Sequence, residues 1–224
     1  ILFVTQFPIA SDFTTIGSTF GNHSGEISVT GRGGDLYIRY TDGSLRNLTR
    51  EAGFGGDGFQ ANNAIAVRDP AVHWSANKAL FSMVVGAPPV IFGERNYFWQ
   101  IYEITGFGQG QTAVITHLAN QPVNYNNITP IYGSDDSIIF TTDMPRTKNR
   151  FNYPQKDEYE SAPTNTGLWK LNPQTGEVSL LQHSPSGSFS PLIDSAGRLV
   201  FTRWDHLQRD QQASPNNNIE AFNY

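Results

Sequence analysis

Trp74-Ser-Ala-Asn-Lys-Ala-Leu-Phe-Ser82 is the stretch that decides the fold, because the chain repeats its pattern twice. Each copy has a polar turn and then an apolar run that closes on Phe followed by Ser or Thr. The other copies are Tyr132–Thr141 and Ile193–Thr202, and the closing phenylalanines lie 59 and 61 residues apart, at Phe81, Phe140 and Phe201. Recurrence at a period of tens of residues is the mark of a repeat architecture.

A second hairpin of aromatic and β-branched residues follows each apolar strand after a long irregular stretch. Asp42-Gly43 and Asn172–Gly176 carry the glycine and proline that tight turns require. The predicted hairpins pair Asp35–Tyr40 with Leu45–Thr49, Phe98–Ile104 with Thr112–Leu118, and Gly167–Leu171 with Glu177–Leu181. Four antiparallel strands per unit make the blade of a β-propeller, so the sequence predicts an all-β fold of this kind.

Counting strands gives two complete blades and two partial ones. The predicted boundaries are a partial blade at 1–49, complete blades at 70–118 and 128–182, and a partial blade at 189–224 whose strands are Phe189–Ile193, Gly197–Arg203 and Ile219–Tyr224. An open arc leaves sheet edges unpaired. We therefore expect an arc of a larger propeller of about six to eight blades. A complete four-bladed ring, closed by the tail, is the alternative.

Composition agrees with many short strands and turns. The chain has 224 residues with 12% aromatic residues, 21 Gly and 13 Pro, and only 16% are charged. No run of about 18 apolar residues predicts a membrane span. The net charge of -5 argues against nucleic-acid binding, which needs a positive field. The absence of cysteine excludes thiolate metal sites and covalent c-type haem attachment within this chain.

Loop lengths indicate which face of the fold is functional. Within each blade the turn between the first and second strands is short, whereas the connection from the second strand to the third is long. In a propeller all the long connections leave from one face, and long loops in compact domains are usually functional. These connections are Pro8–Gly34, Gly86–Tyr97, Asp143–Thr166 and Trp204–Asn218. We expect a ligand, a protein partner or another domain of the same polypeptide on this face.

The last connection supplies the candidate catalytic residues. His206 lies next to Asp205, with Arg209 three positions further on. A histidine oriented by a carboxylate acts as a general base or a metal ligand. The alternative is a loop anchor in which Trp204 packs beneath the loop while Asp205 and Arg209 hold its backbone.

Two further groups are candidate ligands. His23 and Glu26, on the first long connection, form a possible metal site with His206, although plain surface residues are the simpler interpretation. Arg68 and Asp69, which precede a predicted strand at the central channel, are candidates for holding an anionic ligand or for forming a structural ion pair. Trp204 completes the predicted ligand-binding set. His73 is expected to be buried or to line the channel.

Several of these motifs together resemble a known family. Asp42–Thr49, Arg68–Trp74 and Gly197–Asp210 resemble TolB-like propellers, and Asn124–Pro130 with Trp204–Asp210 resemble proteins related to the middle domain of the hydrazine synthase alpha subunit. The resemblance implies a propeller and a periplasmic or otherwise exported location. It does not carry over haem chemistry, because the haem-binding Cys-x-x-Cys-His motifs of those subunits are missing here.

Two classes of function follow. In the first, the chain is a binding or scaffold module of a larger exported bacterial protein, and its long-loop face receives another domain, a protein partner or a small polar ligand. In the second, it is part of a haem or metal enzyme related to the hydrazine synthase alpha subunit, with its active site over the propeller channel. We expect no cofactor within this chain, while the full-length protein could hold haem or a metal.

Overall fold

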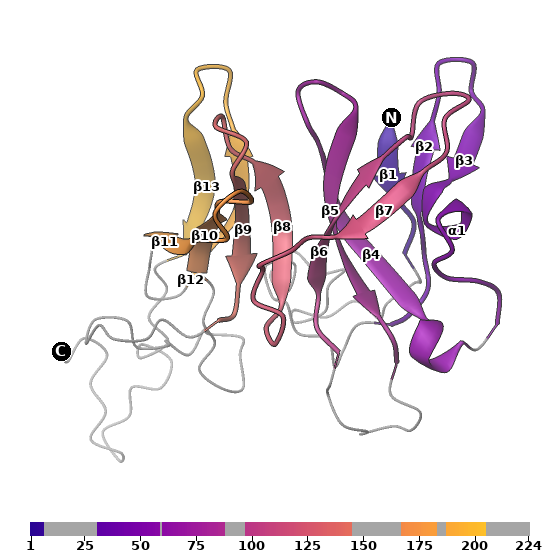
Figure 1. Ribbon diagram of the computed structural model, residues 1–224, viewed down its shortest axis with the longest axis horizontal. Coiled ribbons are helices and arrows are strands. Elements are labelled where there is room, and N and C mark those ends of the chain that lie inside the picture. The colour runs from indigo at the N-terminus through magenta and orange to yellow at the C-terminus, as the bar shows by residue number, and fades with distance from the viewer. Residues whose placement is uncertain (7–30, 59, 88–96, 145–166, 183–186, 205–224) are drawn as a thin grey trace, which may run out of the picture.

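Four antiparallel sheets stand side by side and follow one another along the chain (Figure 1). The structure is a computed structural model that describes residues 1–6, 31–58, 60–87, 97–144, 167–182 and 187–204. The first sheet contains β1 (Leu2–Val4), β2 (Leu36–Arg39) and β3 (Leu45–Asn47), and the second contains β4 (Ile65–Val72), β5 (Lys78–Val85), β6 (Gln100–Thr105) and β7 (Val114–His117). The third contains β8 (Asn127–Tyr132), β9 (Ile138–Thr142), β10 (Gly167–Leu171) and β11 (Val178–Gln182), and the fourth contains β12 (Gly187–Ile193) and β13 (Leu199–Trp204).

The first strands of neighbouring sheets lie against one another. In the described residues β4 contacts β8, and β8 contacts β12. In the first sheet β1 is the first described strand, and it is β1 that contacts β4. Within each sheet the strands follow the chain order outward from this line of contacts. Four-stranded antiparallel sheets packed face to face around their first strands are the arrangement of propeller blades, which confirms the predicted fold class.

The core fills the spaces between the sheets. Between the first and second sheets, Leu36 and Leu48 pack with Phe81 and Ile104. Between the second and third sheets, Leu80 packs with residues such as Phe140. Successive residues of β5 therefore face different neighbours, so the strand is buried on both faces and its sequence is apolar from Ala79 to Val85 except at the buried Ser82.

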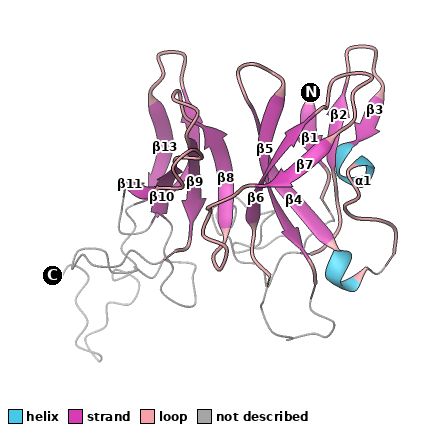
Figure 2. Cartoon of the chain, viewed as in Figure 1, coloured by secondary structure: helices cyan, strands magenta, loops and turns pink. Residues whose placement is uncertain are grey.

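The repeated sequence pattern forms one hairpin in each of the last three sheets. The backbone N–H of His73 donates to Lys78 O at 2.9 Å, that of Gly133 to Ser137 O at 2.7 Å, and that of Asp194 to Arg198 O at 3.0 Å. Each turn contains one residue with positive φ, at Ala76, Asp136 and Gly197. The hairpins appear together at the upper edge of the sheets in Figure 2.

A bulge occurs at the same place in β4, β8 and β12. The bulge residues are Asp69, Thr129 and Ser190, whose φ angles are 54°, 50° and 51°, and each precedes a proline. Proline cannot donate to a sheet ladder and is confined to edge strands, strand ends and bulges. We expected Arg68-Asp69-Pro70 to lie before the strand, but β4 begins at Ile65 because the bulge accommodates the proline inside it.

The first sheet also departs from the prediction at its outer strand. The strand predicted to reach Thr49 ends at Asn47, where α1 (Leu48–Glu51) begins. The side chain of Asn47 caps this helix by accepting from the backbone N–H of Arg50 at 3.0 Å. Asparagine is a strong helix N-cap, so the strand ends at Asn47 and the helix begins at the next residue. Leu48, the last apolar residue of the predicted strand, is then buried in the core.

The ends of the strands show where the long connections attach. Strands β1, β5 and β9 run from the edge with the hairpins to the opposite, lower edge in Figure 1. Strand β13 is antiparallel to β12, as β5 is to β4 and β9 is to β8. The four predicted long connections follow these strands in the sequence. We call this lower edge the loop edge and the opposite one the turn edge. Within the described ranges, none of the helices has the length and apolar character needed to cross a membrane.

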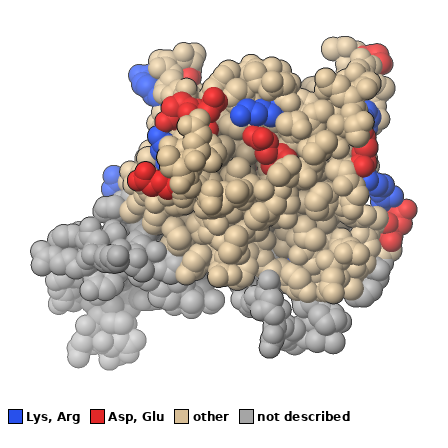
Figure 3. Space-filling view, viewed as in Figure 1, with Lys and Arg blue, Asp and Glu red and all other residues tan. Residues whose placement is uncertain are grey.

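Charged side chains do not gather by sign on the face that Figure 3 shows. Acidic and basic groups are interspersed, mostly near the turn edge and at the outer sides of the sheets. This distribution and the net charge of -5 oppose recognition of a polyanion on that face.

We expect Arg46→Lys to lower the free energy of unfolding by about 1–2 kcal/mol. Arg46 binds Glu51 through two nitrogens, at 2.6 and 3.0 Å, and donates to Gly108 O and Gln111 O in the second sheet, both at 2.8 Å. Lysine cannot reproduce this planar set of contacts between two sheets. Urea denaturation provides the measurement. The control is Arg198→Lys, since Arg198 is 78% exposed and pairs with Asp194 in its own hairpin. An equal loss in both variants would contradict the prediction.

Candidate functional site

All five residues predicted for catalysis and metal binding lie outside the described part of the chain. These are Asp205, His206, Arg209, His23 and Glu26. Trp204 is the last residue of β13, at the loop edge. The roles predicted for these six residues therefore stay predictions. Within the described ranges, no three His, Asp or Glu side chains converge as a metal site would require.

Arg68 and Asp69 form a buried ion pair between the second and third sheets. Arg68 Nε donates to Asp69 Oδ2 at 2.7 Å, and the guanidinium lies 5.6 Å from the ring centroid of Trp99. The backbone N–H of Thr129, in the next sheet, donates to the same carboxylate oxygen at 3.1 Å. Only 2% of the Arg68 side chain is exposed. This geometry agrees with the alternative that Arg68 and Asp69 form an ion pair that stabilises the fold. A ligand-binding role for these two residues stays a prediction.

A cavity of about 420 Å³ opens at the loop edge, between the first and second sheets. One wall is the segment that leads into β2, and the other is the crossing from α1 to β4. Both are rich in glycine, so much of the lining is backbone. The lining residues are Arg32, Gly33, Gly34, Asp35, Gly55, Gly56, Asp57, Gly58, Gln60, Ala64, Ile65 and Ala87.

A hydrogen bond joins the two walls, because the backbone N–H of Gly33 donates to Ile65 O at 2.7 Å. The backbone N–H of Thr5 donates to Asp35 O at 2.9 Å and holds the first wall to the end of β1. Gly55 has a left-handed φ of 70°, and a Cβ there would lie 3.0 Å from Ile65 Cδ1. A glycine at this position therefore lets the crossing approach β4 closely.

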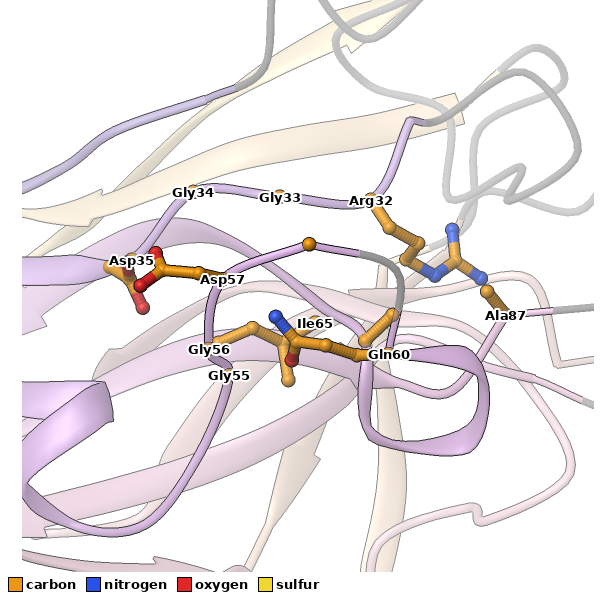
Figure 4. A pocket seen from close by; sticks show the side chains of 12 residues that line it. Arg32, Gly33, Gly34, Asp35, Gly55, Gly56, Asp57, Gln60, Ile65 and Ala87 are labelled. Carbon is orange, nitrogen blue, oxygen red and sulfur yellow. The ribbon is translucent and has the colours of Figure 1, made fainter.

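Opposite charges lie at the two ends of the cavity. Figure 4 shows Arg32 at one end, Asp35 and Asp57 at the other, and Gln60 between them. Arg32 Nε donates to Gly86 O at 2.6 Å, and burial lowers the pKa of the guanidinium. Arg32 thus places a positive charge at this end of the cavity.

The two carboxylates are held from behind. Thr49 Oγ1 donates to Asp35 Oδ1 at 2.6 Å. Arg50 binds Asp57 at 3.0 and 3.2 Å, and these hydrogen bonds lower the pKa of the Asp57 carboxyl, which is ionised at neutral pH. The Asp57 side chain is 94% exposed, so solvent and ligand both reach it.

Sequence reasoning missed this cavity. The segment Gly53–Gly58 is glycine-rich but has neither the spacing nor the following helix of a phosphate-binding loop. The signal that could have indicated the cavity is a second glycine-rich segment, Gly31–Gly34, which contains Arg32. Two such segments at the same edge of adjacent sheets would have suggested a backbone-lined pocket.

No protein-family model matches the chain, and no curated protein matches it either. Among solved structures it is similar to "Kuenenia stuttgartiensis Hydrazine Synthase", with a TM-score of 0.54 and 14% identity over 89% of this chain and 27% of that chain. A puromycin hydrolase aligns with a TM-score of 0.32 and 15% identity, over 71% of this chain and 27% of that chain. This chain thus spans about a quarter of the length of either neighbour. At these identities the first likeness concerns the fold alone, and it supports the sequence resemblance to that extent: the chain has a propeller-like all-β fold.

Proposed function

We propose that this chain is a propeller-like binding module of a larger exported bacterial protein, and that the cavity at its loop edge takes a small polar ligand. The cavity lies where the long connections attach to the sheets. The exported location rests on the family resemblance, and cell fractionation tests it. We place any covalently attached c-type haem of the full-length protein outside this chain, because the chain has no cysteine.

The separation of charge in the cavity carries the proposal. Its volume of about 420 Å³ is in the range of small-molecule sites. Arg32 at one end suits an anionic group, and Asp35 with Asp57 at the other suits a cationic one. Gln60 and the glycine backbones between them offer both donors and acceptors. A ligand that carries a carboxylate and an ammonium group, as amino acids and short peptides do, matches this arrangement.

We expect calorimetric titration with the common L-amino acids, diglycine and dialanine to show binding of at least one zwitterion. Asp57→Asn should weaken that binding about tenfold, roughly 1.4 kcal/mol, because it removes the charge opposite the ammonium group. Because the Asp57 side chain is 94% exposed, we expect this substitution to leave the protein folded, so that weaker binding reports the lost charge. Acetate and methylammonium, which carry one charge each, should bind far more weakly than the zwitterion.

The control is Asp194→Asn, which also removes a carboxylate paired with an arginine, in the hairpin between β12 and β13. It should leave the affinity unchanged. Two results oppose the proposed ligand class: no zwitterion in the panel binds, or Asp57→Asn binds as well as the unmodified protein does.

A further inference from the structure

The turn edge carries an aromatic cluster that lies between the second and third sheets. Trp74 packs against His73 with ring centroids 3.9 Å apart and ring planes tilted by 37°, and Tyr132 and His73 meet edge to face at 4.7 Å. His73 and Tyr132 are buried, whereas Trp74 is 60% exposed. One side of the indole is therefore supported from below and much of the rest faces solvent.

His73 holds this support in a fixed position. The backbone N–H of Ser75 donates to His73 Nδ1 at 3.1 Å, so the ring proton is on Nε2. Nε2 then donates to Asp136 Oδ1, 2.8 Å away in the third sheet. The Ser75 hydroxyl lies 2.6 Å from His73 Nδ1. Because both ring nitrogens are engaged, the imidazole beneath Trp74 cannot turn, and the indole rests on a rigid base.

The second support, Tyr132, is fixed in the same way. Its hydroxyl donates to Glu103 Oε2 at 2.8 Å, and burial together with Glu103 raises the pKa of the phenol. Lys78 Nζ lies 4.8 Å from the Tyr132 ring centroid and 3.7 Å from Glu103. A cation of the protein itself thus already occupies the face of this ring.

The hairpin does not need a tryptophan at this place. In the corresponding turns of the next two sheets, the residue after the first hydrogen-bonded position is Ser134 or Ser195. Those hairpins close with three residues between the bonded pair, whereas the turn with Trp74 has four. Among the three described hairpins, the one with Trp74 therefore has an additional residue and a large exposed aromatic side chain that the other two lack.

We propose that Trp74 is the stacking platform of a saccharide-binding site on the turn edge. A sugar ring has an apolar C–H face, which an indole covers, and a rim of hydroxyl groups that need donors and acceptors together. The exposed rim around Trp74 supplies both, from the Asn77 amide and the Asp136 carboxylate, while the Ser75 hydroxyl is already held by Asn77 Oδ1 and His73 Nδ1. The rigid support of the indole means that binding orders little.

The same features disfavour a cationic ligand. A cation is best held by several aromatic faces and by acceptors alone. Here Lys78 already covers Tyr132, and His73 covers the lower side of Trp74. The site is separate from the loop-edge cavity, so either proposal can fail without the other.

The test is titration of the protein with cellotriose, maltotriose and N-acetylglucosamine trimer. Saturation-transfer NMR detects binding, and calorimetry measures the affinity. We expect at least one of them to bind, and Trp74→Ala to weaken its binding at least tenfold. Trp74→Phe, which keeps a ring over His73, should lose less. The matched control is Leu192→Ala, which removes another half-exposed apolar side chain, on β12, and should leave the affinity unchanged.

Three outcomes overturn the proposal. None of the three saccharides binds; or Trp74→Ala binds them as tightly as the unmodified protein; or tetramethylammonium binds in a Trp74-dependent manner while no saccharide does, which assigns the platform to cations. Melting temperatures of the variants, measured alongside, separate a lost contact from a lost fold.

Discussion

Arg68→Met should lower the free energy of unfolding by about 3 kcal/mol, the largest effect of any single charge change that we expect here. Methionine keeps much of the volume that packs against Trp99 but leaves the Asp69 carboxylate without its guanidinium partner. Removing one member of a buried pair costs about 3–5 kcal/mol. We take the lower end because 24% of the Asp69 side chain is exposed and water screens its charge in part.

A double-mutant cycle in urea identifies the cause of this loss. In the Arg68→Met background, Asp69→Asn should recover part of the stability, since an amide carries no charge to be left unpaired and its oxygen still accepts from the N–H of Thr129. Arg198→Met, at an exposed position, is the control. A strictly additive cycle would contradict the unpaired charge as the cause, and it would point to lost packing against Trp99 instead.

Gly106→Ala should destabilise the fold by about 3 kcal/mol or more, because no side chain fits there. The residue has a φ of 68°, and its Cβ would lie 2.0 Å from Thr112 O, across the turn between β6 and β7. Backbone atoms on both sides must move to relieve this contact. The turn also carries Phe107 O and Gly108 O, which accept from Tyr40 and Arg46 of the first sheet. Its distortion therefore reaches the contact between sheets, beyond the usual penalty of about 1–3 kcal/mol for backbone strain.

Gly110 in the same turn provides the matched control. Its φ is 75°, close to that of Gly106, but a Cβ there would meet nothing within 4 Å. Gly110→Ala should therefore cost about 1 kcal/mol, the strain of the left-handed conformation alone. Thermal unfolding of the two variants measures the difference. Equal melting temperatures would mean that conformation, and not the contact with Thr112, decides the effect.

The periodic part of the fold could be predicted from the sequence. The repeated hairpin pattern located β5, β9 and β13, since a polar turn followed by an apolar run of strand length leaves little choice. Burial on both faces explains why Leu80 and Phe81 are adjacent apolar residues. The side on which the long connections attach followed from the order of the strands.

Other features depended on local exceptions that periodicity does not reveal. Asn47 ended a strand by capping a helix one residue later, and the bulge at Asp69 allowed Pro70 inside β4. The contact of His73 with Asp136 joins two turns that are 63 residues apart in sequence. Only the packing of adjacent sheets brings such residues together, so neither the loop-edge cavity nor the Trp74 platform was predictable from spacing.

The prolines of the three bulges have a consequence for folding. Among the described strands, β4, β8 and β12 each form an edge of their sheet, and their sequences are related by repetition. Before folding is complete, edges of similar sequence can pair in the wrong combination within one molecule or between two molecules. Pro70, Pro130 and Pro191 remove an N–H donor from every one of these edges, and the bulges beside them break the straight line that a foreign strand would follow. We therefore expect these three bulged edges to disfavour strand exchange between repeats and aggregation between molecules.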